Sequence, residues 1–173
     1  MFIQKRIFDK EQCEKIKGLI NEEYKGHSYT NNRGALTFEQ YKILDDTDNK
    51  WFLDVFKNFI YDSTKTIVND IKMDVQILKY VINDNFPKHT DIDHIKKHKS
   101  VRLFTIGILL NDEFDGGDLI VYDIDGEKKL KKEIGNCYIF DAILPHEVTK
   151  ITKGVRYVLI AHLINSEVKK RLM

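Results

Sequence analysis

Short apolar runs separated by turn signals fill the second half of the chain, and they restrict the folds that it can form. Runs rich in valine, isoleucine and aromatic residues begin at Val75, and turn signals such as Asp125–Gly126 separate them. About eight strands are predicted, at residues 75–82, 86–91, 101–110, 119–122, 128–134, 137–143, 146–151 and 155–164. Short strands at this spacing indicate a β-sandwich or a barrel, and a double-sheet jelly roll (a double-stranded β-helix) accommodates this number of strands.

The chain before these strands carries mainly helical patterns, with one extended segment expected at residues 36–44. Asp9 and Gln12 match a capping box, and the apolar residues that follow recur at helical spacing until Gly26, where this helix is expected to end. A second helix is predicted from near Thr47 to Ile67, with an aromatic-rich apolar stripe. Such a broad apolar face favours packing on a sheet over the binding of a partner.

These patterns predict a single, mainly β domain over residues 1–173. The helical support would occupy residues 9–71, and the jelly-roll core would occupy residues 75–164. A chain of 173 residues, of which 42% are hydrophobic, is long enough to bury one such core.

The composition argues against several classes of protein. A formal net charge of +1 gives no electrostatic reason to expect a nucleic-acid or membrane partner. The two cysteines, Cys13 and Cys137, are too few for a disulfide framework, and both fall in apolar patterns that predict buried thiols. No stretch matches a signal peptide or reaches membrane-spanning length, so a cytoplasmic location is expected. The oligomeric state does not follow from the sequence.

Three residues with metal-binding side chains form the main functional signal. His89 and Asp91 are two positions apart on a predicted strand, so their side chains would point to the same face and could reach one metal ion. His146, far downstream, can supply a third ligand. Two imidazoles and one carboxylate form a facial triad, which leaves coordination positions open and suits non-haem Fe(II).

Arg156 adds a carboxylate-binding group to this arrangement. It follows His146 across a predicted turn at Thr152–Gly154, so it could lie on a strand antiparallel to the one that carries His146. A guanidinium binds carboxylates bidentately. An open iron site beside such a group is the layout expected of an oxygenase that uses Fe(II), O2 and 2-oxoglutarate.

Further residues continue this pattern over residues 76–164. The ordered set is Tyr80, Phe86, His89, Asp91, Arg102, Leu110–Asn111, Gly116–Gly117, Gly135, Phe140, His146–Glu147–Val148 and Gly154–Val155–Arg156–Tyr157. A histidine-x-aspartate pair alone is a weak signal, whereas the whole set at this spacing is specific. It resembles the iron(II)- and 2-oxoglutarate-dependent dioxygenases, and within them the prolyl 4-hydroxylase-like group.

The resemblance implies roles for five residues. His89, Asp91 and His146 would hold the catalytic iron, and Arg156 would pair with the distal carboxylate of 2-oxoglutarate. Tyr80 would form a hydrogen bond to the same carboxylate. The implied reaction couples conversion of 2-oxoglutarate to succinate and carbon dioxide with hydroxylation of an amino-acid residue, with ascorbate as a reductant. A prolyl residue in a peptide or protein is the leading candidate for the substrate.

Three positions depart from the prolyl hydroxylase pattern. His162 stands where that group often has a tryptophan, and Ile160 stands where threonine or serine is common. Asn83 replaces a glycine and can still adopt a left-handed turn. These changes leave the iron ligands intact but alter the expected pocket wall, which puts specificity for proline in question.

Two alternative functions follow from these observations. In the first, the chain is an oxygenase of the same kind whose substrate is a free amino acid or a lysyl residue. In the second, the chain is not an enzyme but a jelly roll that binds a metal or a small carboxylate. The presence of both Arg156 and Tyr80 argues against the second alternative, because a bare metal-binding shell has no need of them.

Other polar residues near the motif have simpler interpretations. Asp93 is too far along a strand from the first histidine to share its metal ion. His94 and His98 would form a zinc pair only on a helix, which this basic stretch does not indicate. Arg102 is expected to form a structural salt bridge, and Gly116–Gly117 to form a turn or bulge.

Residues 92–100 are expected to form a loop between two strands. Related enzymes use such a loop as a lid over the substrate. Its lysines, Lys96, Lys97 and Lys99, could attract an acidic substrate, but a solvated loop is the favoured interpretation.

Overall fold

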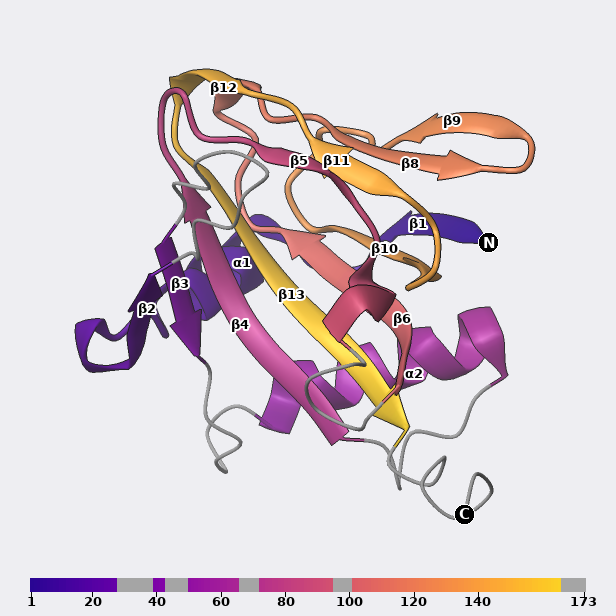
Figure 1. The fold of residues 1–173 in the computed structure, drawn as a ribbon. Coiled ribbons are helices and arrows are strands. Elements are labelled where there is room, and N and C mark those ends of the chain that lie inside the picture. Colours follow the sequence, from indigo (N-terminus) through magenta and orange to yellow (C-terminus); the bar gives the residue numbers. More distant parts are fainter. Residues whose placement is uncertain (28–38, 43–49, 66–71, 95–100, 166–173) are drawn as a thin grey trace.

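The computed structural model describes residues 1–27, 39–42, 50–65, 72–94 and 101–165. Within these residues, most strands belong to two antiparallel sheets that lie one over the other (Figure 1). The larger sheet contains, in spatial order, β1 (Phe2–Arg6), β10 (Asn136–Asp141), β6 (Val101–Leu109), β13 (Arg156–Asn165), β4 (Lys72–Tyr80), β3 (Glu39–Lys42) and β2 (Lys25–His27). The smaller sheet contains β5 (Phe86–His89), β11 (His146–Val148), β8 (Leu119–Asp123) and β9 (Gly126–Lys129). A separate antiparallel pair joins β7 (Phe114–Gly116) to β12 (Ile151–Gly154).

The central strand β13 shows why the molecule has two cores. Its residues alternate between the two faces of the larger sheet. Leu159 and Leu163 are buried in a cluster with residues of the helices, whereas Val158 is buried in a cluster with residues of the smaller sheet. Arg156 and His162 are an even number of positions from Val158, so they share its face and lie in the space between the two sheets.

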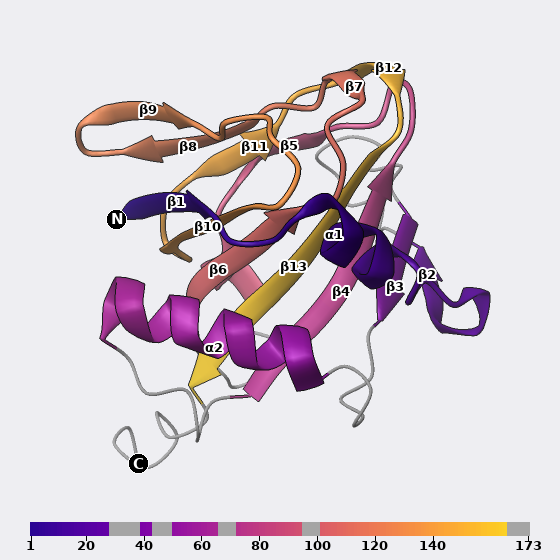
Figure 2. The same cartoon turned by 180° about the vertical axis from the view of Figure 1, so that it is seen from behind.

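Two helices, α1 (Lys10–Lys17) and α2 (Lys50–Thr64), cover the outer face of the larger sheet (Figure 2). Phe52, Phe56 and Ile60 recur at helical spacing on α2 and are completely buried in the cluster with that sheet. Burial of each such side chain contributes about 1.5–3 kcal/mol to stability. The apolar stripe on the second helix therefore packs on a sheet, as the sequence predicts. Cys13 and Cys137 are buried free thiols, also as predicted.

The first helix is shorter than its pattern predicts. Asp9 and Gln12 do form a complete capping box. The helix nevertheless ends at Gly18 and not at Gly26, because a glycine inside a helix costs about 1 kcal/mol relative to alanine. The chain then forms the short 3-10 helix η1 (Glu22–Tyr24) and enters β2.

Three predictions about the strands need correction. Residues 9–71 also supply β2, which no pattern predicts, and β3, which lies within the extended segment expected at residues 36–44, to one edge of the larger sheet. The strand predicted at 146–151 is two strands, since the chain leaves the smaller sheet after β11 and pairs with β7 through β12. The residues predicted as a turn before Arg156 belong to β12, and Arg156 itself lies in the larger sheet, not on a strand paired with His146.

Parts of several predictions lie outside the described residues. These are the start of the second helix near Thr47, its end beyond residue 65, and the loop at residues 95–100. Among the described residues, no helix has the length and apolar character needed to cross a membrane.

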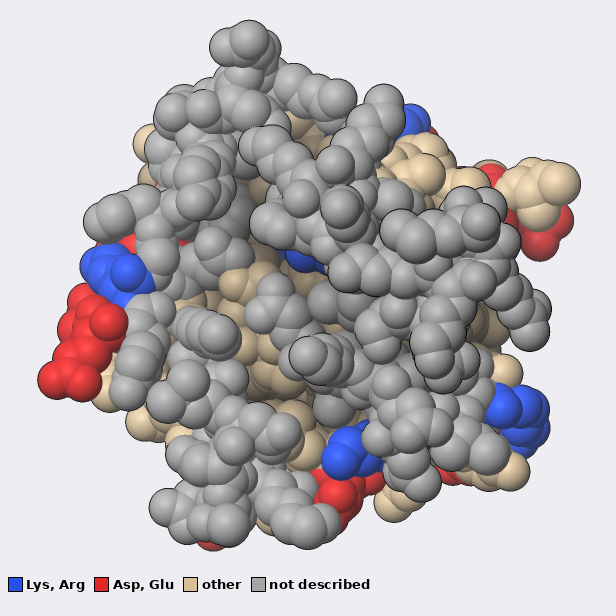
Figure 3. All heavy atoms as spheres, turned by 60° about the horizontal axis from the view of Figure 1, so that its bottom comes forward, with Lys and Arg blue, Asp and Glu red and all other residues tan. Residues whose placement is uncertain are grey.

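The described surface carries charges of both signs. Figure 3 shows basic and acidic side chains beside one another near the rim of one face. Among the described residues, Glu39 forms ion pairs with Lys25 and with Lys79, at nitrogen–oxygen distances of 2.6 and 2.8 Å. Ion pairs near the surface usually contribute less than about 1 kcal/mol each.

Candidate metal and cosubstrate site

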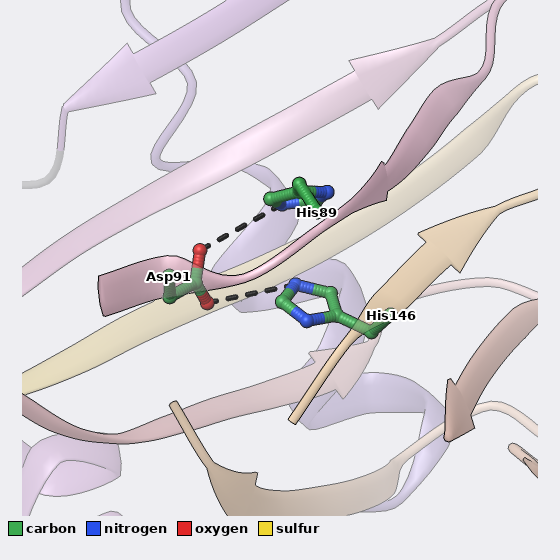
Figure 4. Close-up of side chains that lie close together, drawn as sticks. All are labelled: His89, Asp91 and His146. Carbon is green, nitrogen blue, oxygen red and sulfur yellow. Dashed lines mark ion pairs between the residues drawn. The ribbon is translucent and has the colours of Figure 1, made fainter. Parts of the chain in front are cut away.

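His89, Asp91 and His146 lie together at one end of the space between the sheets. His89 ends β5, and His146 begins β11 directly opposite it in the smaller sheet. Asp91 is the first residue of the 3-10 helix η3 (Asp91–His94), and its carboxylate faces both imidazoles (Figure 4). Its two oxygens are 3.7 Å from His89 Nε2 and 3.6 Å from His146 Nε2. One potential ligand atom from each residue lies within 4.8 Å of the others.

The three predicted ligands therefore come together, although not from one continuous strand. The prediction placed both His89 and Asp91 on an extended segment, but β5 ends at His89. The turn of η3 then brings the carboxylate back toward the imidazoles. The backbone N–H of Asp91 donates to the carbonyl of Ala142, at 2.9 Å, and this bond fixes the turn beside the residues that precede β11.

Hydrogen bonds to the backbone orient both imidazole rings. Nδ1 of His89 is 2.8 Å from the carbonyl oxygen of Pro87, and Nδ1 of His146 is 3.0 Å from that of Leu144. A carbonyl oxygen can only accept, so Nδ1 carries the proton in each neutral ring. The lone pair of each ring is then on Nε2, the atom that faces Asp91. A metal-binding histidine commonly donates its other ring N–H in this way.

The protonation states also suit a metal ion. Burial, together with the neighbouring His146, lowers the pKa of His89 to about 4, so this ring is neutral at neutral pH. Burial alone would raise the pKa of Asp91. Interactions with His162, His146 and Thr105 outweigh that effect and hold the pKa of Asp91 below its usual range. The site thus presents the neutral His89 imidazole and the Asp91 carboxylate beside the His146 ring, and two imidazoles with one carboxylate are a donor set for non-haem iron.

Arg156 lies at the other end of the same space and is almost completely buried, with 1% of its surface exposed. Its Nε and Nη1 atoms have no hydrogen-bond partner among the described residues. An unpaired buried cation is strongly unfavourable. The arrangement therefore fits an anion that would bind there, and a dicarboxylate could reach from Arg156 toward the metal ligands.

Two residues shape the surroundings of Arg156. Tyr80 is its direct partner across β4 and β13, with the guanidinium carbon 5.1 Å from the tyrosine ring centroid. Burial raises the pKa of Tyr80 to about 12, so its hydroxyl keeps its proton and can donate to a carboxylate. Gly117 has a positive φ of 61°, and a Cβ there would lie 3.1 Å from Arg156 Cδ. Gly116, at φ 70°, also has left-handed geometry, which agrees with the predicted turn or bulge.

Comparison with known families settles which group of proteins has this arrangement. Residues 75–163 match the family model described as the 2OG-Fe(II) oxygenase superfamily. This segment is about half of the chain and contains all three candidate ligands, Tyr80 and Arg156. The chain belongs to the 2OG-Fe(II) oxygenase superfamily.

Relatives within the superfamily are hydroxylases. A PKHD-type hydroxylase of Prochlorococcus marinus (strain MIT 9515) is 30% identical over 86 residues, which are 50% of this chain and 39% of the relative. A PKHD-type hydroxylase of Burkholderia ambifaria (strain MC40-6) is 31% identical over 72 residues, which are 40% of this chain and 32% of the relative. The match thus spans well under half the length of these curated relatives.

Solved structures of the superfamily share the fold. An oxidoreductase of the 2OG-Fe(II) oxygenase family from Burkholderia pseudomallei has a TM-score of 0.75 at 15% identity, covering 94% of this chain and 84% of that one. A Pseudomonas putida prolyl-4-hydroxylase has a TM-score of 0.71 at 15% identity, covering 94% and 91%. At this identity the similarity establishes the fold alone, and it confirms the predicted jelly roll.

Three residues around Asp91 had no role in metal binding in the sequence analysis. The hydroxyl of Thr105 donates to Oδ2, and Nε2 of His162 is 3.5 Å from the same oxygen. Nη1 of Arg102 is 3.7 Å from Oδ1. The predicted salt bridge of Arg102 therefore exists, but its partner is a candidate metal ligand. Alternation along β6 and β13 could suggest the facing side chains, whereas the register that places Thr105 opposite His162 becomes visible only in the fold.

The other residues singled out in the sequence have different outcomes. His98 lies outside the described residues, and the side chains of Asp93 and His94 are not described, so the zinc pair stays untested. Ile160 lies between Arg156 and His162 on the inward face of β13 and packs against the cluster between the sheets. Asn83 has a φ of 76°, so it does adopt the left-handed conformation expected from its place in a turn.

Proposed function

We propose that the protein is a 2-oxoglutarate- and Fe(II)-dependent oxygenase that hydroxylates a prolyl residue in a peptide or protein, and that residues 1–173 act as a single domain. The observation that carries the proposal is the placement, between the two sheets, of an imidazole–imidazole–carboxylate set and of a buried guanidinium whose Nε and Nη1 atoms have no hydrogen-bond partner among the described residues. The first group fits iron, and the second fits a carboxylate of 2-oxoglutarate.

Each residue of the site has a defined task in this proposal. His89, Asp91 and His146 hold the iron, and the backbone carbonyls behind the imidazoles keep each Nε2 free of a proton. Arg156 binds the distal carboxylate of the cosubstrate, and the hydroxyl of Tyr80 donates a hydrogen bond to the same carboxylate. When bound, iron and 2-oxoglutarate supply the oxidising chemistry, with succinate and carbon dioxide as coproducts.

The apolar walls between the two ends keep water out. Val158 lies between Arg156 and His162 along β13, and its cross-strand partners are Leu109 in β6 and Leu78 in β4. All three apolar residues are buried in one cluster. Apolar surroundings strengthen the charge interaction between Arg156 and a bound carboxylate.

The choice of a peptidyl substrate rests on relatives and neighbours. The matched relatives are PKHD-type hydroxylases. One structural neighbour is a prolyl hydroxylase from Trichoplax adhaerens in complex with a peptide fragment of hypoxia inducible factor, with a TM-score of 0.71 at 15% identity and coverage of 99% of this chain and 86% of that one. Because His162 and Ile160 differ from the prolyl hydroxylase pattern, the identity of the residue that is hydroxylated is the part of the proposal to test first.

The test combines cosubstrate turnover with mass spectrometry of the substrate. Purified protein with Fe(II), ascorbate and 2-oxoglutarate should form succinate, and proline-containing peptides should gain the mass of one oxygen atom. Matched peptides with alanine in place of proline should stay unmodified. Asp91→Ala should reduce turnover by more than about 100-fold, since loss of a direct ligand exceeds the 10–100-fold cost typical of outer hydrogen-bond partners.

Three other outcomes have distinct meanings. Modification of lysine peptides or of free amino acids would keep the oxygenase and reject the prolyl substrate. Metal and 2-oxoglutarate binding without turnover on a broad panel would favour a non-catalytic binding module. Turnover that survives Asp91→Ala would reject the assignment of the site.

A further inference from the structure

His162 is a buried histidine that the proposed reaction does not require. It lies on β13, 6% exposed, with Nε2 3.5 Å from Oδ2 of Asp91. Its cross-strand neighbour Thr105 donates a hydrogen bond to the same oxygen. Two adjacent positions of the larger sheet therefore converge on one carboxylate oxygen of a candidate iron ligand.

The hydrogen-bonding state of His162 follows from this contact. The Asp91 carboxylate is acceptor-only, so a favourable contact needs the proton on Nε2. Nδ1 is buried and has no hydrogen-bond partner among the described residues. An unpaired buried polar atom destabilises the fold, and an apolar ring of the same size would avoid that cost. Packing therefore does not explain a histidine here, whereas donation from Nε2 to Asp91 does.

The remaining contacts show what such a donor would achieve. Oδ1 of Asp91 faces Nε2 of His89 and Nη1 of Arg102, each at 3.7 Å. Oδ2 faces His146, His162 and Thr105. Donors from the larger sheet thus hold the carboxylate while the imidazoles of the smaller sheet approach it from the other side. Hydrogen bonds that orient a ligand commonly account for about 10–100-fold in metal affinity.

We propose that His162 is a positioning residue that fixes the carboxylate of Asp91 for metal binding through a hydrogen bond from Nε2 to Oδ2. The inference rests on the proposed function, since it assigns Asp91 to a metal ion. It concerns affinity for the metal, so it can be tested without a substrate.

The test uses variants that separate hydrogen bonding from packing. In His162→Gln the amide nitrogen takes the place of Nε2, whereas in His162→Asn it corresponds to Nδ1 and cannot reach Asp91. His162→Phe keeps a ring without a donor. Mn(II), which is stable in air, replaces Fe(II) in calorimetric titrations of the full chain. We expect His162→Phe and His162→Asn to weaken Mn(II) binding by about 10–100-fold and His162→Gln to remain within about 3-fold of wild type.

Two controls show whether a loss of affinity is specific. Ile160→Val changes the neighbouring position on the same face of β13 and should leave Mn(II) affinity unchanged. Thermal melts of the metal-free proteins should show that His162→Phe and His162→Asn still unfold cooperatively, so that a loss of Mn(II) affinity does not come from a loss of the fold.

The outcomes separate this inference from the proposed function. Wild-type affinity in His162→Phe would overturn the role of His162 and leave the oxygenase proposal in place. An equal loss in the Gln and Phe variants would also overturn it, since His162 would then act by shape alone. Failure of the wild-type chain to bind Mn(II) would overturn the proposed function itself.

Discussion

Burial of Arg156 affects protein stability and carboxylate binding in opposite directions. Its guanidinium is buried with two nitrogen atoms unpaired among the described residues, and an unsatisfied buried polar group costs about 1–3 kcal/mol. The same atoms are available to a carboxylate, and each hydrogen bond to a charged group contributes about 1.5–3 kcal/mol. Under the proposed function, the residue destabilises the empty protein and stabilises the complex with 2-oxoglutarate.

Replacement of Arg156 by methionine should have opposite effects on these two properties. Arg156→Met keeps an apolar chain of similar reach, so we expect the free energy of unfolding of the metal-free protein to stay the same or rise by about 1–3 kcal/mol. We expect the affinity for 2-oxoglutarate in the presence of Mn(II) to fall by about 100-fold or more. Urea denaturation measures the free energy of unfolding, and calorimetry measures the affinity.

Arg156→Lys, which keeps the charge but loses the bidentate fork, should lie between wild type and Arg156→Met in affinity for 2-oxoglutarate. A destabilised Arg156→Met variant that still binds 2-oxoglutarate would show that this side chain is structural.

At the scale of elements, Glu39 links the edge of the larger sheet to the strand that carries Tyr80. It lies on β3, and its carboxylate binds Lys25 of β2 at 2.6 Å and Lys79 of β4 at 2.8 Å. The hydrogen bonds from Lys25, Lys79 and Tyr41 lower the pKa of Glu39 from its usual value of 4.5 to about 2. One ionised side chain therefore adds to the backbone pairing of the three edge strands.

The ion pairs of Glu39 should make the stability of the folded protein depend on pH under acidic conditions. The folded-state pKa is below the unfolded value, so the stabilisation by Glu39 is fully present above pH 4.5 and is lost as the pH falls toward about 2. Glu39→Gln should be less stable than wild type at pH 6, and the difference in melting temperature should shrink between pH 4.5 and pH 2. Melts across this range measure it. Parallel curves for the two proteins would mean that the pKa of Glu39 is not lowered by folding.

Helices and strands were predictable where neighbouring residues in the sequence determine them. They were not predictable where they depend on pairing with a strand far away in the sequence. The capping box of Asp9 and Gln12 and the apolar run of β6 depend on neighbours in sequence, and both form as expected. The break between β11 and β12 depends on pairing of β12 with β7, more than thirty residues earlier in the chain. For the same reason, no local signal places Asp91 in a 3-10 turn after β5 or moves Arg156 into the larger sheet.

At the scale of the molecule, the site exists only because the two sheets face each other. His89 and His146 come from the smaller sheet, Asp91 comes from the turn beside it, and Arg156 and His162 come from the larger sheet (Figure 1). The residue types and their order predicted that His89, Asp91 and His146 come together, and the role of Arg156 in carboxylate binding stays a prediction. The donors behind Asp91 could not be predicted, because their proximity is a result of sheet register and docking rather than of any local pattern.

The central claim is that a metal ion and a dicarboxylate occupy one space between the sheets, and metal-dependent binding of 2-oxoglutarate tests it most directly. In calorimetric titrations of the wild-type chain and of Asp91→Ala, the account predicts that 2-oxoglutarate binds the wild type only when Mn(II) is present, because both ligands share the site. Asp91→Ala should bind neither ligand measurably. Equally tight binding of 2-oxoglutarate with and without Mn(II), or undiminished Mn(II) binding by Asp91→Ala, would contradict the account.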